Sequence, residues 1–389
     1  MQDAQLDGVR SRVYGLENAL AERAVYLLDK LSRCVIHPYV MTSSSSNITQ
    51  NGITSMAVED FRNDQDGPIV FMRMRVYTAD SLTGAAAAGS IFSNVSIQAF
   101  DLEGSHMLNK DPTLLPVLLS YRENTHVLDR PYVLDRRSAL LVQLTEEDIN
   151  GTTDVVVAVH GECVLGDLSG REVEEAIALG VYPLAGRQSS LWDTTLLYGS
   201  LFGTRPPRLK GETADKLEAL RIRVAYLREM LRLAEYSTYI LEDGAANLAQ
   251  AVDTALSRER FRNDQNGPLA VQRIRVWSVT GGFAAAAAVA ALDNLAFRFE
   301  SIDERILLTK DPVLSPVLFS RADNTWVLEH PHIIGKRGSV QVSIREQNAN
   351  ATTDCNLAIM CEAVRNVTAE ELRAAVTLGL YPFMNRARS

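Results

Sequence analysis

Histidine is the residue type best suited to proton transfer and to metal binding, and the chain contains six of them. Only His330 and His332 lie close together in sequence. A protein zinc site needs three or four ligands, and no Cys, Asp or third His stands next to this pair. The pair is therefore a weak candidate for a metal site, and we expect no metal or other cofactor there.

Acidic residues around Asp64-x-Asp66-Gly67, and again at 264–267, resemble the first half of a calcium-binding loop. The glutamate that completes such a loop, and its spacing, are missing. Asp, Asn and Gly also favour turns, so a turn before a strand explains the same residues. We interpret both segments as turns.

Two arginines, Arg73 and Arg75, share one face of a predicted strand and recur as Arg273 and Arg275. Their repetition favours structural ion pairing, with Asp64 or Asp264 as possible partners, over catalysis. No nucleophile elbow, phosphate-binding loop, zinc-protease motif or dinucleotide fingerprint occurs in the sequence. We therefore predict that the protein is not an enzyme.

The elements that carry these residues are duplicated. Residues 61–68 recur as 261–268 with one substitution, and Lys110-Asp111-Pro112 recurs as 310–312. The offset of 200 persists to about residue 365, so the two copies must have nearly equal loop lengths and nearly the same fold. Histidines and cysteines do not follow this register, whereas a site copied by duplication would be expected to appear twice.

Alternating apolar residues in both copies predict strands that are covered on one face. Seven or eight short strands in about 100 residues predict a β-sandwich. A capping-box pattern begins a short closing helix at 169–172, and again at 368–371. The expected fold is mainly β with flanking helices: two tandem jelly-roll-like sandwiches, each preceded by a long helix and closed by a short one.

The predicted domain boundaries follow from this expected fold. We expect an N-terminal helix and connector at 1–60, a first jelly-roll-like domain at 61–184, a linker at 185–213, a second helix and connector at 214–260, and a second jelly-roll-like domain at 261–389.

Each predicted leading helix carries an apolar seam. In the second copy the leucines and one valine follow a 3-4-3-4 spacing, which is typical of helices that pair. Such a helix can pack on its own domain, or it can pair with its copy or with another subunit. The predicted oligomer contacts are Leu217, Leu220, Val224, Leu227 and Leu231, with Leu20, Leu27 and Leu31 in the first copy.

Composition excludes several classes of partner. The net charge of −9 argues against binding to nucleic-acid backbones, which requires clustered Lys and Arg. No run of 18 apolar residues is present, so we expect no membrane partner. The four cysteines, Cys34, Cys163, Cys355 and Cys361, lack CxxC spacing and fit a reducing compartment, with the last three buried as small hydrophobic residues.

The pattern Asp-Pro-x-Leu-x-Pro-Val-Leu at 111–118, together with the last strand Thr-Thr-Asp-Val-Val-Val-Ala-Val-His-Gly-Glu at 152–162, resembles jelly-roll virion proteins of tailed bacteriophages. The resemblance covers about 61–165 and 261–365. It implies a non-enzymatic capsid decoration, cement or minor capsid protein that self-associates and binds a capsid or neck lattice. Its partners would be copies of itself and other virion proteins such as the major capsid protein. It would be made in the host cytoplasm and reside in the virion.

Two alternatives remain open. The duplication also suits double jelly-roll major capsid proteins, in which two copies per chain let a trimer occupy a six-fold position. The second alternative is a carbohydrate-binding sandwich used in host recognition. Its aromatic platform would have to come from Trp277 and Trp326.

Overall fold

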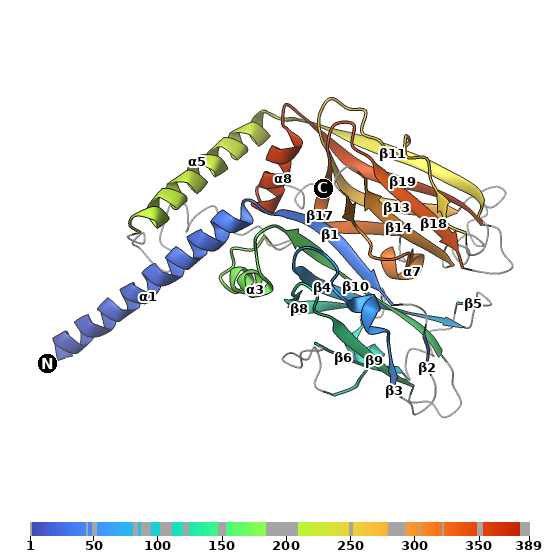
Figure 1. Ribbon diagram of the computed structural model, residues 1–389, viewed down its shortest axis with the longest axis horizontal. Helices are drawn as coiled ribbons and strands as arrows, with labels where there is room; N and C mark the ends of the chain where they lie inside the picture. The colour runs from blue at the N-terminus through green and yellow to red at the C-terminus, as the bar shows by residue number, and fades with distance from the viewer. Residues whose placement is uncertain are drawn as a thin grey trace.

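A computed structural model describes most of the chain, with several gaps (Figure 1). The described residues are 2–43, 46–48, 53–80, 85–86, 95–101, 111–119, 124–146, 153–183, 209–248, 252–278, 292, 294–302, 305–320, 323–347 and 353–381. Most of the predicted 185–213 linker lies outside them. Among these residues, no helix combines the length and the apolar content needed to span a bilayer.

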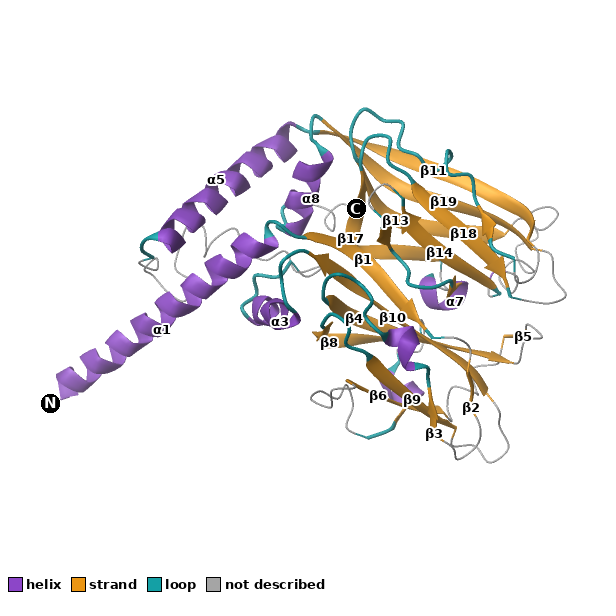
Figure 2. Ribbon diagram, viewed as in Figure 1, coloured by secondary structure: helices purple, strands orange, loops and turns teal. Residues whose placement is uncertain are grey.

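The first half of the chain begins with a long helix, continues with short and long strands, and ends with a short helix (Figure 2). Its elements are α1 (Gln2–Leu31), β1 (Val35–Thr42), β2 (Ser46–Ile48), β3 (Ile53–Ser55), the 3-10 helix η1 (Val58–Phe61), β4 (Ile69–Asp80), β5 (Ala85–Ala86), β6 (Val95–Asp101), β7 (Thr113–Leu114), α2 (Leu115–Leu118), β8 (Thr125–Leu134), β9 (Leu140–Glu146), β10 (Thr153–Leu165) and α3 (Gly170–Ala178).

The second half repeats this order. Its elements are α5 (Glu212–Leu233), β11 (Glu235–Leu248), β12 (Thr254–Ala255), β13 (Leu269–Ser278), β14 (Leu295–Ser301), β15 (Ile306–Leu307), β16 (Val313–Leu314), α7 (Ser315–Leu318), β17 (Thr325–Ile334), β18 (Val340–Glu346), β19 (Thr353–Arg365) and α8 (Ala369–Thr377).

The sheet order defines a jelly roll in each half. In the first half one sheet is ordered β1-β10-β4-β8 and the other β3-β9-β6-β7. In the second half the corresponding orders are β11-β19-β13-β17 and β12-β18-β14-β16. Eight antiparallel strands that alternate between two sheets in this order form a jelly roll. The predicted fold class is confirmed, and β1 and β11 show that the first strand of each jelly roll precedes residues 61 and 261.

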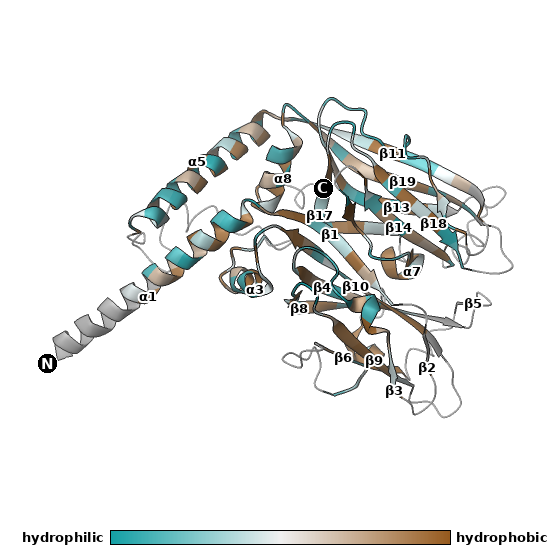
Figure 3. Ribbon diagram, in the orientation of Figure 1, coloured by the Kyte–Doolittle hydropathy of each residue, from teal (hydrophilic) through white to brown (hydrophobic). Residues whose placement is uncertain are grey.

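Each sandwich is held together by the apolar residues that alternate along its strands. The core of the first contains Ile97, Val142 and Val157, and the core of the second contains Phe297 and Val342 in equivalent places. Figure 3 shows apolar residues concentrated on strands such as β6, β9 and β14, and polar stretches along α5. Apolar burial of this kind stabilises a sandwich in proportion to the area removed from water.

The closing helices begin and end as the sequence predicts. Ser169 and Glu172 form a reciprocal capping box at the start of α3, and Thr368 starts α8 in the same way. Gly180 and Gly379 follow the helices with φ of 68° and 65°. This left-handed conformation, which lets the chain leave a helix, costs glycine least because it has no Cβ.

Candidate functional site: the interface between the two jelly rolls

The repeated motif at 61–68 is a structural turn. Asn63 is fully buried, and its side-chain amide donates to the carbonyl oxygens of Gly67, Leu134 and Asp135 at 3.0, 3.2 and 3.0 Å. Its Oδ1 accepts from the backbone N–H of Gln65 at 2.9 Å. Asn263 makes the same four bonds in the second half. The turn interpretation is confirmed, because the motif ties the start of β4 to the end of β8.

The candidate chemical groups do not gather into a metal site. No cluster of three His, Cys, Asp or Glu that could hold a metal occurs within the described part of the chain. All four cysteines are buried, as predicted for three of them. Burial raises the pKa of Cys34 to about 11 and that of Cys355 to about 12, which keeps these thiols protonated and unreactive at neutral pH.

The leading helices pack against each other inside one chain. Leu27 and Leu31 of α1 share an apolar cluster with Leu217, Leu220, Val224 and Leu227 of α5. Leu231 packs instead with the cluster that surrounds α8. Leu20 remains exposed at 40%. The seam therefore pairs a helix with its copy, and the role of these residues in contacts between subunits stays a prediction.

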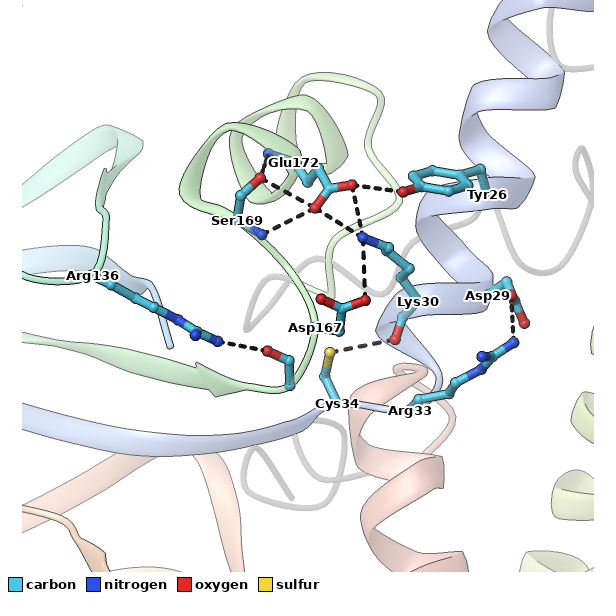
Figure 4. A network of polar contacts seen from close by, with 10 residues as sticks. Tyr26, Asp29, Lys30, Arg33, Cys34, Arg136, Asp167, Ser169 and Glu172 are labelled. Atoms are coloured by element: carbon cyan, nitrogen blue, oxygen red, sulfur yellow. Dashed lines mark hydrogen bonds and ion pairs between the residues drawn. The ribbon is translucent and has the colours of Figure 1, made fainter. Parts of the chain in front are cut away.

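A polar network joins α1 to the closing helix of its own half (Figure 4). The Lys30 ammonium lies 3.1 Å from Glu172 and 3.6 Å from Asp167, and the Tyr26 hydroxyl donates to Glu172 at 2.9 Å. Burial opposes ionisation of Glu172, but hydrogen bonds from Ser169, Lys30 and Tyr26 outweigh it and lower its pKa to about 2. The carboxylate that caps α3 thereby also binds Tyr26 and Lys30 of α1.

The interface between the jelly rolls begins at the edge of β1. Val40 pairs as an isolated parallel bridge with Thr309 of the second half. Its N–H donates to the carbonyl of Leu308 at 3.0 Å, and its carbonyl accepts from the N–H of Lys310 at 2.9 Å. The Lys310 ammonium reaches back to Asp64 at 3.0 Å. The edge strand β1, which would otherwise expose unpaired backbone groups, thus binds the second half of the chain.

The short helix α7 seats on the β4–β10 surface of the first jelly roll. His160 donates from Nε2 to the carbonyl of Val317 at 2.7 Å, and Arg75 donates from Nη1 to the carbonyl of Leu318 at 3.2 Å. Val317 and Leu318 are fully buried, and Arg75 is only 4% exposed. Burying a guanidinium is costly unless its N–H groups are satisfied, so this contact requires close registration of the two domains.

Strand β17 adds a second group of polar contacts. Glu162, which is fully buried, pairs with His330, and its other carboxylate oxygen accepts from the Tyr182 hydroxyl at 3.0 Å. Arg73 lies 3.0 Å from Glu329. The predicted structural ion pair of Arg73 is therefore present, but its partner is Glu329 on the other jelly roll rather than Asp64, because only the folded chain brings β17 to β4.

Histidines also line this interface. Burial lowers the pKa of His37 to about 3, with His332 adding to the effect, and burial alone lowers the pKa of His332 to about 4. Burial lowers the pKa of His160 as well. Burial opposes protonation of His330, but the neighbouring Glu162 outweighs it and raises the pKa. The histidines that looked like candidate chemistry are thus interface residues.

The apolar core is continuous across the same surface. Val40, Tyr77, Val156 and Ala158 of the first half belong to the apolar cluster of the second jelly roll. Figure 1 shows β1 and β17 meeting between the two sandwiches. The two jelly rolls are therefore packed as one block, joined by apolar contact and by buried polar bonds.

Sequence reasoning missed this interface. One indication was available: His160 and His330 lie on strands whose copies carry Met360 and Arg130 at the same positions. A polar residue that changes between otherwise matching strands marks a surface with different surroundings in the two halves. Strand periodicity alone cannot show it, because interface residues and outward-facing residues share the same face of the sheet.

The fold and this interface define a class: a chain of two jelly rolls packed side by side as one block. No protein-family model and no curated protein matches the sequence. Solved structures that are similar include one of Sulfolobus Turreted Icosahedral Virus, at 11% identity and a TM-score of 0.24, covering 91% of this chain and all of that one.

Two further solved structures are similar at the same level. The major capsid protein P2 of bacteriophage PM2 matches at 8% identity and a TM-score of 0.22, over 84% of this chain and 97% of that one. Infectious bursal disease virus VP2 matches at 9% identity and a TM-score of 0.22, over 88% of this chain and 74% of that one. Tripeptidyl peptidase 2 also matches, at a TM-score of 0.19. Scores this low carry no argument about function, and the fold assignment rests on the strand order.

Proposed function

We propose that the protein is a non-enzymatic building block of a virus shell, of the double jelly-roll type. The observation that carries this proposal is the union of two complete jelly rolls into one block through a buried interface. Jelly rolls serve as viral capsid domains, as lectins and as metal-holding cupins. Here the histidines that a cupin would need are used at the interface between the domains.

The carbohydrate-binding alternative is less well supported. Trp326 is only 2% exposed and packs against Phe299 with ring centroids 5.6 Å apart. An indole buried in this way cannot serve as a stacking platform for a sugar. We therefore prefer a role as a shell subunit to the predicted decoration or cement role. Two jelly rolls joined through a shared interface suit a unit of the shell lattice better than a protein that binds to a finished lattice.

The test is the location and copy number of the protein in particles from the virus or host cell that carries its gene. Quantitative mass spectrometry should find it among the most abundant proteins, and antibody labelling in electron microscopy should cover the whole shell. A few copies confined to a neck or fibre tip would overturn the proposal. Binding to a glycan array together with fibre-tip labelling would favour the lectin.

A further inference from the structure

Because of the duplication, each jelly roll carries the same two kinds of surface, a socket and a plug. The interface within the chain uses the socket of the first half and the plug of the second half. We call the surface of the first half the inner socket; it comprises Val40, Arg73, Arg75, His160 and Glu162. The surface of the second half that packs against it is the inner plug, comprising Val317, Leu318, Val327, Glu329 and His330; Val327 takes part through its carbonyl, which accepts from Arg73.

Each surface has a counterpart 200 residues away in sequence. The outer socket, on β11, β13 and β19, comprises Ile240, Arg273, Arg275, Met360 and Glu362. The outer plug, on α2 and β8, comprises Val117, Leu118, Val127, Asp129 and Arg130. In Figure 1 β11 lies on the outer side of the second sandwich, away from the interface.

Solvent exposure differs sharply between the inner and outer surfaces. Val317 is fully buried, whereas Val117 is 75% exposed. Val40 is 1% exposed, whereas its counterpart Ile240 is 54% exposed. Arg75 is buried, whereas Arg275 is exposed. The outer surfaces therefore keep the large apolar residues of an interface on positions that face solvent within one chain.

The motif that forms the outer plug is kept in sequence although nothing in the described part of the chain covers Val117. Pro116-Val117-Leu118 matches Pro316-Val317-Leu318 residue for residue. Both segments form the same one-turn helix with proline in its first turn. The carbonyls that accept from His160 and Arg75 in the inner plug therefore have counterparts in α2. Of the two donors, Arg75 has the equivalent Arg275, whereas Met360 in place of His160 offers an apolar contact instead.

The charges of the outer surfaces are complementary in the same pattern as those of the inner ones. Where Arg73 pairs with Glu329, the outer surfaces offer Arg273 and Asp129. Where Glu162 pairs with His330, they offer Glu362 and Arg130, and Glu362 keeps the tyrosine bond of its counterpart through Tyr381.

We infer that the outer plug of one chain docks into the outer socket of a second copy, repeating the contact that joins the two jelly rolls within a chain. This inference rests on the proposed shell function and names its first assembly contact. The contact is head-to-tail, because each chain brings one plug and one socket. A heterologous contact of this kind closes into a ring or extends as a filament, depending on its rotation.

The experiment uses two single variants of the full chain. Val117→Asp places a carboxylate in the plug, and Arg275→Glu reverses a charge in the socket. Ile53→Asp, at a similarly exposed position on β3 of the opposite sheet, is the matched control. Far-UV circular dichroism and the thermal midpoint establish that each variant is folded.

Analytical ultracentrifugation and native mass spectrometry then measure assembly size. The wild type and the Ile53→Asp control should form oligomers, and Val117→Asp and Arg275→Glu should each sediment as a single chain. An equimolar mixture of the two variants should form a species of two chains and nothing larger, because one intact plug and one intact socket remain.

Several results would overturn the inference: a wild type that stays a single chain at high concentration, folded variants that assemble like the wild type, or a variant mixture that stays monomeric. Capture of a different protein by the outer plug of a monomeric wild type would also overturn it. Each result is separable from the shell proposal, because a protein that covers a shell in particles but does not self-assemble in solution would contradict only the head-to-tail contact.

Discussion

The matched valines Val117 and Val317 allow the contribution of the interface to the free energy of unfolding to be measured. Val317→Ala removes two methyl groups from a fully buried side chain at the centre of the contact with β4 and β10. At about 0.8 kcal/mol per buried methylene-sized group, the lost transfer free energy is about 1.6 kcal/mol. A residual cavity adds roughly 24 cal/mol per Å³, which brings the expected loss of unfolding free energy to about 2–3 kcal/mol.

The same substitution in the first half should have almost no effect on the single chain. Val117 is 75% exposed, so Val117→Ala should change the free energy of unfolding by less than about 0.5 kcal/mol. Because the backbone and the neighbouring proline are alike in α2 and α7, the difference between the variants isolates the burial supplied by the other jelly roll.

Urea unfolding followed by tryptophan fluorescence measures this difference, with the buried Trp326 reporting on the second jelly roll. The protein should be dilute enough to remain a single chain. A loss of about 2 kcal/mol corresponds to a roughly 30-fold change in the ratio of folded to unfolded molecules. Equal shifts for the two variants, or no shift for Val317→Ala, would refute the packing of α7 on the first jelly roll.

Three other predictions concern the turn, the interface and the helix network. Gly67→Ala should lower stability by roughly 2 kcal/mol, since an added Cβ would lie 1.9 Å from a backbone carbonyl of β10; an unchanged thermal midpoint would contradict this. Acid should loosen the interface. His37 and His332, with pKa values of about 3 and 4, stay neutral when folded but take up protons below about pH 6.5 when unfolded. His160, whose pKa burial also lowers, adds to the loss, and the raised pKa of buried Glu162 opposes it. Each histidine that stays neutral in the fold contributes roughly 1.4 kcal/mol per pH unit below about pH 6.5, so stability should fall as the pH drops from about 6.5 to 4.5, and a flat urea midpoint over that range would be inconsistent with this. Glu172→Gln keeps a capping-box residue but loses the ionic contact to α1, so the free energy of unfolding at pH 7 should fall by about 1 kcal/mol. The difference from wild type should shrink as the pH falls from about 4.5 towards 2, because the wild-type carboxylate is then protonated. Calorimetry across this pH range is the check.

The local structure of each half was predictable from short-range patterns. Alternating residues such as Val155 and Val157 predicted the strands, and the Ser169–Glu172 pattern predicted the start of α3. These predictions succeed because strand alternation, capping and turn formation depend on residues that are neighbours in sequence. The constant offset of 200 then required both halves to have one fold.

The partners of charged residues were not predictable in the same way. Arg73 was matched to Asp64 because both lie in one repeat, yet it pairs with Glu329. An ion pair across a domain interface depends on how two finished sandwiches dock, which neither repeat encodes by itself. The apolar seams of the leading helices were found in sequence, but the structure was needed to show that α1 and α5 pair within the chain.

The sequence by itself determined that two equal units exist, that each is a β-sandwich between helices, and that turn and cap residues were copied with them. Only the tertiary structure decided which of two equivalent surfaces is covered. Val117 and Val317 are each flanked by the same two adjacent residues, a proline and a leucine, yet one faces solvent and the other is buried. The physical reason is that local patterns fix the shape of a surface, whereas burial depends on what packs against it, and a single chain with two plugs and two sockets can bury only one pair.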